Sequence, residues 1–576
     1  MREILHKADL CVVGGGLAGM CTAIAAARHG AKVILMQDRP VLGGNASSEV
    51  RMWISGAHGE NNRETGIVEE IELENLYRNP NASYSIWDSV LYEKVRFQEN
   101  ITLLLNCTCN ELTMDGNRIK SVRGWQLTTE TWHTVEAFLF ADCSGDSILA
   151  PLSGAEYRIG REAARELNED IEPEHADTKT MGMSCLIQVR ETDKPQKFIP
   201  PVWANTYLTD KDLPYRDHNL EKLNNFWWIE LGGDKDSIHD TEEIRDELLK
   251  IAFGVWDHIK NRGDHNADNW ILDWVGFLPG KRESRRYVGD YILNQNDVRA
   301  EGKFHDLVAY GGWTMDDHHP AGFHYPGFPN VFHPAPSPFG IPYRCLYSKN
   351  IENLYFAGRN ISVTHAALSA TRVMATCALV GQAVGVAAAI AVRKGLSPRK
   401  IYEKCIPELQ QTLMEDDCYL PWHRREIPEL TKRAVLTAST GDPEAIRNGV
   451  DRPLGKQDNG WTGTLGDSWI EYKFAEMEKI NKMRFVFDSD LNRTEKNMPC
   501  NYPLHDNLRK VPETIIRKFR IEAMKDNGQW ETVLCVDNNY QRLVRIKLDI
   551  IASAVRFIPE QTWGSKTTHI YAWDVS

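Results

Sequence analysis

The sequence has no CxxC pair, although it contains 12 cysteines among 576 residues. The nearest approach to a pair is Cys107-Thr108-Cys109, whose spacing places both thiols on one face of a predicted strand. No second pair of ligands accompanies these two residues. Neither a structural metal site nor a disulfide framework is therefore predicted, and we expect no bound metal ion.

The sequence also lacks an excess of positive charge, because its formal net charge is −13. Such a charge repels nucleic acids and anionic membrane surfaces, so neither is expected as a partner. A predicted strand begins within about ten residues of Met1, which leaves no room for a signal peptide. We expect a cytoplasmic protein, unless a leader was removed.

Long hydrophobic runs are scarce, and one run alone imitates a membrane span. Residues 373–392 are apolar except for Thr376 and Gln382, and they would cross a bilayer core of about 30 Å. The run consists mostly of alanine, glycine and valine, and Gly381 and Gly385 form a GxxxG pattern that suits close helix packing. A buried helix packed against the first helix of the chain is predicted instead of a membrane span.

A glycine-rich turn, Gly14-Gly15-Gly16-Leu17-Ala18-Gly19, separates a strand predicted over residues 9–13 from a helix predicted over 17–29. A second strand is predicted over residues 32–36. In such a unit Gly14 makes the tight turn, Gly16 lets the backbone approach a pyrophosphate, and Gly19 lets the helix pack on the strand. The helix N-terminus offers free N–H groups to the phosphates. In this context the turn predicts a bound dinucleotide.

The end of the second predicted strand carries Gln37, where a dinucleotide-binding unit usually has an acidic residue that binds a ribose hydroxyl. Asp38 follows it. A glutamine oxygen accepts a hydrogen bond from a hydroxyl more weakly than a carboxylate does. Both residues therefore remain candidates for the ribose contact.

Three further segments narrow the identity of the dinucleotide. They are a second glycine-rich loop, RPVLGGNASS (39–48), the turn ADCSGD (141–146) and the segment NLYFAGR (353–359). Together with the blocks GGNASSEVRMWISGAHG, RESRRYVGDY and RNISVTHAALSATRVMATCALVGQAVG, they resemble a bacterial family of FAD-dependent oxidoreductases with two glycine loops.

The resemblance implies FAD as the cofactor. The residues that it places at FAD are Gly14, Gly16, Leu17, Ala18, Gly19, Gln37, Asp38, Arg39, Gly43, Gly44, Asn45, Ala46, Ser48, Cys109, Ser144, Gly145, Gly358 and Arg359. No other GxGxxG follows a predicted strand, so the sequence indicates no second dinucleotide domain and identifies no electron acceptor.

A chain of this length should hold two or three domains. The resemblance implies an α/β fold, with a Rossmann-type FAD-binding domain built from residues 1–150 and 345–396. An inserted α+β substrate domain, rich in tryptophan, is expected over residues 151–344. A helical connector is predicted over 397–430, and the oligomeric state is not indicated.

Residues 431–576 alternate apolar and polar positions, as half-buried antiparallel strands do. Strands are predicted over 468–474, 483–487, 519–523, 544–548 and 554–558, which indicates an all-β sandwich. This part resembles discoidin-like sandwiches, many of which bind carbohydrate. Glycan binding and a purely structural role are both open, because Trp461 and Trp563 could stack on a sugar or lie in the core.

Histidines and arginines supply the catalytic candidates, because oxidation of a hydroxyl by a flavin needs a group that accepts its proton. His365 precedes the predicted buried helix, His58 follows the second glycine loop, and His318 lies in an aromatic loop with two aspartates. Arg282 belongs to the RESRR block, where it could bind an anion or form a structural ion pair. Arg372 lies seven residues after His365 and shares its face if the helix continues.

We expect an FAD-dependent oxidoreductase that oxidises a hydroxyl of a carbohydrate or glycoside by hydride transfer to flavin N5. One alternative is flavin-assisted glycoside cleavage or elimination through a transient keto-sugar, with no net redox change. The other is a non-catalytic glycan-binding protein on a flavoprotein scaffold. The expected partner is a small-molecule or glycan substrate.

Overall fold

The computed structural model describes residues 2–576 and divides into two compact units. The first unit comprises residues 1–57, 82–409 and 496–508, and the second comprises 58–81, 410–495 and 509–576. The predicted boundaries differ from this division in several places, and the predicted connector 397–430 is divided after residue 409. Residues 151–344 are part of the first unit, residues 58–81 group with the C-terminal part, and residues 496–508 return to the first unit.

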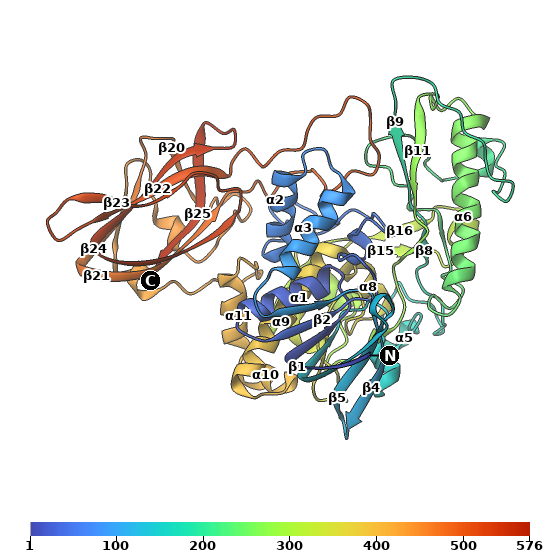
Figure 1. Cartoon of the computed structure of the whole chain (residues 1–576), viewed down its shortest axis with the longest axis horizontal. Coiled ribbons are helices and arrows are strands. Elements are labelled where there is room, and N and C mark those ends of the chain that lie inside the picture. Colours follow the sequence, from blue (N-terminus) through green and yellow to red (C-terminus); the bar gives the residue numbers. More distant parts are fainter. Residues whose placement is uncertain (1) are drawn as a thin grey trace. The chain divides into compact units, whose positions relative to one another are not determined.

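A seven-stranded sheet organises the first unit (Figure 1). Its strand order is β3-β2-β1-β6-β5-β4, and β18 pairs with the C-terminal part of β6. The strands β1, β2, β3, β6 and β18 are parallel to their neighbours in this group, whereas β4, β5 and β6 form an antiparallel meander. The bounds are β1 Arg2–Val13, β2 Val33–Met36, β3 Ile101–Leu104, β4 Cys107–Asp115, β5 Arg118–Gln126, β6 Thr131–Asp142 and β18 Leu354–Phe356.

Two apolar helices, α1 (Leu17–Arg28) and α9 (Met374–Lys394), pack closely against each other. A Cβ atom added to Gly381 would lie 2.1 Å from the Ala18 carbonyl oxygen, and one added to Gly385 would lie 2.3 Å from that of Thr22. Within residues 2–576, α9 is the one helix long and apolar enough to cross a membrane, and 94% of its apolar window is buried. The predicted buried helix is confirmed.

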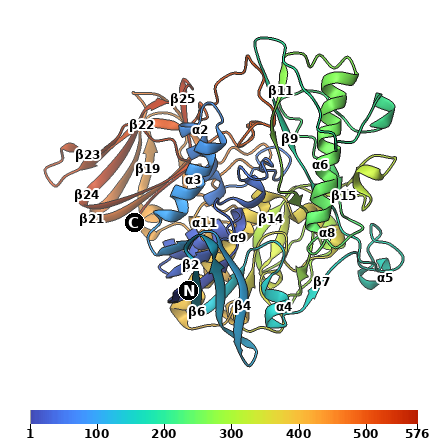
Figure 2. The same cartoon turned by 45° about the vertical axis from the view of Figure 1, so that its right-hand side comes forward.

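The part of the first unit between residues 151 and 344 is built from short strands and one long helix (Figure 2). Helix α6 covers a core that contains Phe226, Trp228, Trp256 and Trp270. The strands form several small sheets, among them β10-β8-β12 and β11-β9. The bounds are β8 Met183–Ser184, β9 Ile187–Glu191, β10 Glu230–Leu231, α6 Thr241–Asp257, β11 Trp270–Val275, β12 Gly280–Lys281, β15 Met315–His318 and β16 Asn330–His333. Helix α8 (His365–Thr371) follows later in the chain.

The remaining helices and strands of the chain, apart from those of the C-terminal sheet, are shorter or peripheral to the cavity described below. They are α2 Ile67–Arg78, α3 Tyr84–Arg96, α4 Leu149–Ser153, β7 Tyr157–Arg158, α5 Ala164–Leu167, β13 Arg286–Tyr287, α7 Gln295–Arg299, β14 Leu307–Gly311, β17 Phe339–Pro342, α10 Pro398–Lys404, α11 Ile406–Glu415 and α12 Glu429–Arg433.

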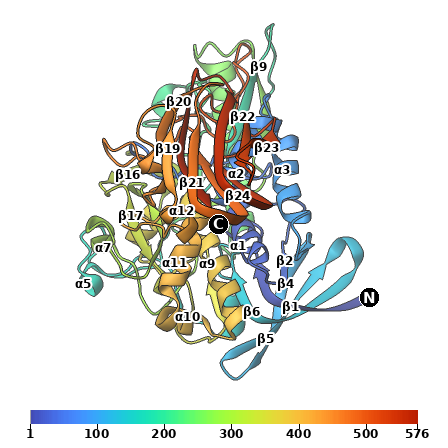
Figure 3. The same cartoon turned by 90° about the vertical axis from the view of Figure 1, so that its left-hand side faces the viewer.

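The second unit contains seven antiparallel strands around an aromatic core (Figure 3). Two long strands each replace two predicted ones. β21 begins at Ile470, inside the predicted strand 468–474, and continues through 483–487, and β24 contains both 544–548 and 554–558. The middle of β21 is exposed and its register with β24 shifts there, so apolar alternation is interrupted. The bounds are β19 Val435–Ala438, β20 Trp461–Thr464, β21 Ile470–Phe487, β22 Ile516–Met524, β23 Trp530–Val536, β24 Leu543–Thr562 and β25 Thr567–Val575.

The two tryptophans that could stack on a sugar, Trp461 and Trp563, make packing and hydrogen-bond contacts within the second unit. Trp461 is 2% exposed and its Nε1 donates to the Thr440 carbonyl at 2.8 Å. Trp563 packs edge-on against Tyr77 and donates to the Asn539 carbonyl at 2.8 Å. Of the two roles left open by the sequence, the structure therefore favours packing for both side chains.

Candidate functional site

The first glycine turn lies between β1 and α1, where the strand ends and the helix begins. Gly14 has a φ of +102°, and a Cβ atom at this position would lie 2.5 Å from the backbone of Cys143. A Cβ on Gly19 would lie 1.9 Å from the Gly14 carbonyl oxygen. Side chains at either position would push the helix away from the sheet, so both glycines are required by the packing.

The second glycine loop lies directly against the first. The Gly43 N–H donates to the Gly15 carbonyl at 2.9 Å, and a Cβ on Gly44 would lie 3.1 Å from Gly16 Cα. Gly43 and Gly44 have φ values of +103° and +57°. The two loops thus present bare backbone to the same space, which suits the close approach of a pyrophosphate.

Gln37 and Asp38, the two candidates for the ribose contact, have different surroundings. The Gln37 side-chain oxygen accepts the Gly15 N–H at 2.6 Å, and its amide nitrogen donates to the Val41 carbonyl at 3.1 Å. Gln37 is therefore engaged in holding the turn. Asp38 is exposed and its nearest ionic partner is Arg39, at 3.6 Å. The Asp38 carboxylate is the group with acceptor capacity left for a ligand.

The two loops border a cavity of about 720 Å³ in the first unit. This volume is in the range typical of small-molecule and cofactor sites. Most of the residues that the resemblance placed at FAD line it. They are Gly14, Gly16, Leu17, Ala18, Gln37, Asp38, Arg39, Gly43, Gly44, Asn45, Cys109, Ser144, Gly145, Gly358 and Arg359.

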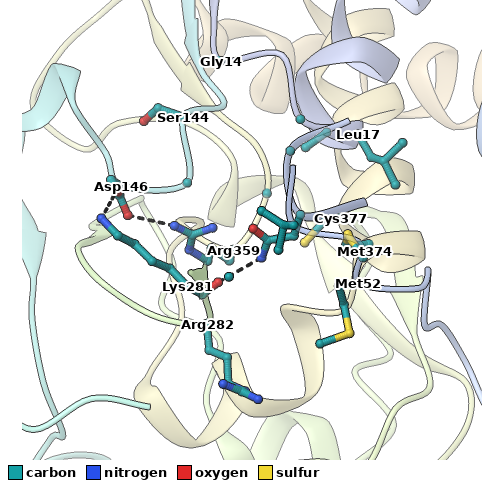
Figure 4. Close-up of a pocket in the computed structure, with 18 of the residues that line it drawn as sticks. Gly14, Leu17, Met52, Ser144, Asp146, Lys281, Arg282, Arg359, Met374 and Cys377 are labelled. Carbon is teal, nitrogen blue, oxygen red and sulfur yellow. Dashed lines mark hydrogen bonds and ion pairs between the residues drawn. The ribbon is translucent and has the colours of Figure 1, made fainter. Parts of the chain in front are cut away.

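Asp146 anchors one wall of this cavity, as Figure 4 shows. Its carboxylate binds Arg359 Nη2 at 2.8 Å and Lys281 Nζ at 2.9 Å. Burial opposes ionisation, but these two cations outweigh it and lower the pKa of Asp146 to about 2. Gly145 is required beside them, because a Cβ there would lie 2.6 Å from the Arg359 guanidinium. In the view of Figure 4, Arg359 and Lys281 lie between Gly14 and Arg282.

A second group of charged side chains, which we call the His318 cluster, also lines the cavity. Glu230 binds His318 Nδ1 at 2.7 Å and Arg282 Nη1 at 3.2 Å. Asp316 lies 3.3 Å from His318 Nε2 and 3.2 Å from Arg372 Nη2. The His318 cluster therefore consists of one imidazole, two carboxylates and two guanidinium groups. Of these, His318, Asp316, Arg282 and Arg372 line the cavity together with Trp227 and Trp313.

The carboxylates of the His318 cluster are kept ionised by their neighbours. Burial would raise the pKa of Glu230, but Arg282 and His318 outweigh burial and lower that pKa. Burial likewise opposes ionisation of Asp316, and His318 and Arg372 hold its pKa well below the usual range. Asn330 donates a further hydrogen bond to Asp316 at 2.6 Å. Asn330 and Arg372 thus hold Asp316 beside the His318 ring.

His365, a predicted catalytic base, does not line the cavity. Its Nδ1 lies 2.8 Å from Glu283 Oε2 and its Nε2 lies 3.1 Å from Asp317 Oδ1. Burial alone would lower the pKa of this imidazole, but the two carboxylates raise it well above its ordinary value. Because the ring lies outside the cavity lining and has a carboxylate at each nitrogen, the structure gives no support to His365 as the base. The side chain instead fixes the start of α8.

Four other predicted site residues also lie outside the cavity lining. His58 is exposed and belongs to the second unit. Gly19 packs helix on strand, the Ala46 carbonyl accepts the Trp87 Nε1–H at 2.7 Å, and the Ser48 N–H donates to Asp88 at 3.1 Å. The last three residues support the shape of the glycine loops without facing the cavity.

Arg372 lines the cavity, although not through the helix that the sequence suggested. Helix α8 ends at Thr371, Arg372 is its C-cap, and Val373 is extended before α9 begins. The Arg372 guanidinium is directed to Asp316 by contacts of 3.0 Å to its carbonyl and 3.2 Å to its carboxylate. Four cavity-lining residues that the sequence did not single out for the site are Asp146, Trp227, Lys281 and Asp316.

A family model described as FAD dependent oxidoreductase matches residues 9–413. The chain belongs to this family. FAD is therefore its cofactor, and the protein is an FAD-dependent oxidoreductase. No curated protein matches the chain.

The residues of the cavity fit this cofactor. Four glycines, Gly14, Gly16, Gly43 and Gly44, line the cavity with bare backbone. A Cβ at these positions would contact neighbouring atoms or take up room in the cavity. Arg359 and Lys281 add positive charge at its wall. Bare backbone at a helix N-terminus together with cations is the environment that a pyrophosphate requires.

Several solved structures are similar to a quarter of the chain. The family 32 carbohydrate-binding module from Streptococcus pneumoniae EndoD is 14% identical, with 26% of this chain and 97% of that chain covered and a TM-score of 0.20. The family 32 module of C. perfringens NanJ, in complex with galactose, is 13% identical, with coverages of 25% and 94% and a TM-score of 0.18. At these scores the similarity indicates no ligand for this chain.

Proposed function

We propose that this protein binds FAD in the cavity of the first unit and oxidises a hydroxyl group of a carbohydrate or glycoside by hydride transfer to flavin N5. One observation carries the proposal. A single cavity is lined both by the two glycine loops and by the His318 cluster with two tryptophans. Cofactor-binding backbone and candidate acid–base chemistry therefore border the same space.

The sheet β3-β2-β1-β6 with its glycine turn supports a Rossmann-type binding mode for the cofactor. In this proposal the Gly14–Gly16 turn and the N-terminus of α1 hold the pyrophosphate. Asp38 binds the ribose, because Gln37 is already engaged with Gly15. Arg359 and Lys281, both fixed by Asp146, balance the negative charge of the phosphates.

When bound, FAD supplies the acceptor for the hydride that leaves the substrate carbon. The hydroxyl proton must leave as well, and we assign its removal to His318 Nε2 in the form of the ring that carries its one proton on Nδ1. Asp316, 3.3 Å from Nε2, then stabilises the charged ring that results. Glu230 accepts a hydrogen bond from Nδ1–H, which fixes the tautomer and supports the charge that develops on the ring. Arg282 and Arg372 place positive charge near the oxygen as it loses its proton.

The aromatic wall favours a sugar as the substrate class. Trp227 and Trp313 line the cavity beside the polar groups, as in sites where flat apolar faces position a ligand and a few polar groups orient it. The substrate itself should be a hydroxyl-bearing ring small enough to share the cavity with the cofactor.

The test is anaerobic mixing of the FAD-loaded protein with a panel of monosaccharides and glycosides. The proposal predicts that at least one sugar bleaches the flavin absorbance and yields one equivalent of a carbonyl product. Bleaching by no sugar, with full FAD occupancy, would overturn it. Product that accumulates beyond one equivalent without an acceptor would replace net oxidation by flavin-assisted elimination.

A further inference from the structure

Four side chains from separate segments of the first unit converge on one point, away from the cavity. Asp210 lies in a short 3-10 turn, His218 in the loop that follows, His258 at the end of α6, and His265 in the next loop. One ligand atom from each of these residues lies within 4.8 Å of all the others. We call this group the His258 cluster.

Four of the six separations within the His258 cluster are close to those expected around a tetrahedral metal ion, and all six are within 4.8 Å. His258 Nε2 lies 3.1 Å from both His265 Nε2 and Asp210 Oδ1. Asp210 Oδ1 lies 3.6 Å from His265 Nε2 and 3.7 Å from His218 Nε2. Ligands at about 2.0–2.1 Å from a tetrahedral zinc ion are separated by roughly 3.4 Å from one another. The observed distances lie on both sides of this value.

The outward ring nitrogens give independent evidence for a ligand. His258 Nδ1 lies 3.0 Å from the Tyr207 carbonyl oxygen, and His218 Nδ1 lies 2.6 Å from that of Arg216. Because a carbonyl only accepts hydrogen bonds, each Nδ1 carries a proton, and Nε2 is the ring atom that each histidine directs into the cluster. Metal-binding histidines are usually oriented in this way by a carbonyl or carboxylate.

When the rings are neutral, the cluster offers no donor for the Nε2 lone pairs that meet there. His258 Nε2 and His265 Nε2 face each other at 3.1 Å, and the third neighbour, Asp210, is a carboxylate. Nitrogen and carboxylate lone pairs at this separation repel unless a proton or a cation lies among them. Three imidazoles and one carboxylate form a donor set that suits zinc.

The surroundings indicate a structural rather than a catalytic ion. His258 is fully buried, His218 and His265 are half-buried, and the Asp210 side chain is 73% exposed, so an ion can enter from the side of Asp210. Thr241 at the start of α6 lines the FAD cavity, whereas His258 follows 17 residues later. At 1.5 Å per residue, the two ends of α6 are about 25 Å apart.

We propose that Asp210, His218, His258 and His265 bind one Zn²⁺ ion. The ion would tie the loop that carries Asp210 and His218 to the end of α6, beside the tryptophan-rich core. The five-residue π-helical turn that begins at His258 (His258–Arg262) is a local departure from α-helical geometry of the kind that recurs at ligand sites.

The first experiment measures metal in the full-length, untagged protein after dialysis against metal-free buffer, by inductively coupled plasma mass spectrometry. We expect about one zinc ion per chain. Asp210→Asn and His258→Ala should both lower this content at least tenfold. Asp210→Asn is the safer variant, because its exposed side chain can change without disturbing the core. Another first-row divalent ion that follows the same pattern would support the site and identify its metal.

The matched control is His239→Ala. His239 is an exposed histidine that also contacts a carboxylate, with its Nδ1 2.8 Å from Asp236. It lies just before the first residue of α6, at the end of the helix away from His258. Its substitution should leave the metal content unchanged. Metal retained by both cluster variants would overturn the proposal, because the ion would then be bound elsewhere.

A second measurement covers the case in which purification strips the ion. Zinc is added to chelator-treated wild-type protein, and both the affinity, by competition with a chromophoric chelator, and the thermal midpoint are recorded. The proposal predicts 1:1 binding and a raised midpoint that Asp210→Asn abolishes. No zinc at purification, no binding and an unchanged midpoint would show that the cluster is a hydrogen-bonded group of histidines without a metal.

Discussion

Glu230 holds His318 by a contact of 2.7 Å between its Oε2 and the ring Nδ1. Since a carboxylate only accepts hydrogen bonds, this contact places a proton on Nδ1, and Nε2, 3.3 Å from Asp316, is the ring nitrogen that can exchange a proton with the cavity. The second Glu230 oxygen lies 3.2 Å from Arg282, so the carboxylate is itself fixed. The pair has the arrangement expected of a base and the residue that orients it.

The first prediction concerns His318. Replacing it in His318→Gln keeps a polar side chain but removes the proton acceptor, so the rate of flavin reduction by the substrate should fall about 10²–10⁴-fold. FAD content should stay at the wild-type value, because His318 is not part of the glycine loops. Stopped-flow absorbance under anaerobic conditions measures the rate. A variant that is reduced as fast as wild type would remove His318 from the mechanism.

The second prediction compares two glycines with positive φ. Gly14→Ala places a methyl group 2.5 Å from the Cys143 backbone at a φ of +102°, whereas Gly30→Ala, at +94°, meets nothing within 4 Å. Both variants carry similar backbone strain, of about 1 kcal/mol. Only Gly14→Ala should lose FAD, as measured from the flavin absorbance of the purified protein. Equal FAD content in the two variants would contradict the tight-turn role.

The third prediction separates Gln37 from Asp38. Asp38→Asn should weaken FAD binding by about 1.5–3 kcal/mol, the contribution of a hydrogen bond to a charged group, and leave thermal stability unchanged. Gln37→Ala should lower both, because the Gly15 N–H and the Val41 carbonyl lose their partner. Calorimetric titration with FAD and thermal unfolding of the apoprotein give the two readouts. The reverse pattern would assign the ribose to Gln37.

The fourth prediction concerns the pH dependence of stability. The pKa of His365 is raised in the folded protein by Glu283 and Asp317, against the effect of burial. The stabilisation from its charge is therefore complete below the unfolded pKa of about 6.5 and is lost as pH rises through the folded pKa. His365→Gln should cost about 3–5 kcal/mol of unfolding free energy near neutral and acidic pH. This difference should shrink at alkaline pH.

Urea unfolding across this pH range checks the fourth prediction. His319→Gln is the control, because His319 is exposed and stacks on Tyr325 without a carboxylate contact of this kind. A difference between wild type and His365→Gln that grows with pH would contradict the assignment of a protonated ring.

Much of the nucleotide-binding part could be predicted because its signals are local. The glycine turn, the alanine-rich helix and the strand that follows it are contiguous in sequence, and α1 and β2 lie within a residue or two of their predicted bounds. The contact of Gly381 with Ala18 was also predictable in kind, since a GxxxG pattern allows helices to approach closely.

The remainder of the site could not be predicted, because short, non-periodic elements bring it together. Glu230 and Lys281 reach it on the sheet β10-β8-β12, in which each strand has only two residues. Two residues show no apolar alternation, so neither strand is visible in the sequence. The surroundings of His365 could not be predicted for another reason. Its place beside the motif was read correctly, but its carboxylate partners, Glu283 and Asp317, lie 82 and 48 residues away.

Hydride transfer from the sugar to the flavin is tested most directly by a kinetic isotope effect on the anaerobic bleaching of the bound flavin. The sugar found to reduce the protein is compared with the same sugar deuterated at the carbon that becomes the carbonyl. We predict that the deuterated sugar bleaches the flavin severalfold more slowly, and that the product is the corresponding keto-sugar or lactone. Bleaching at equal rates, with deuterium retained in the product, would contradict hydride removal from that carbon.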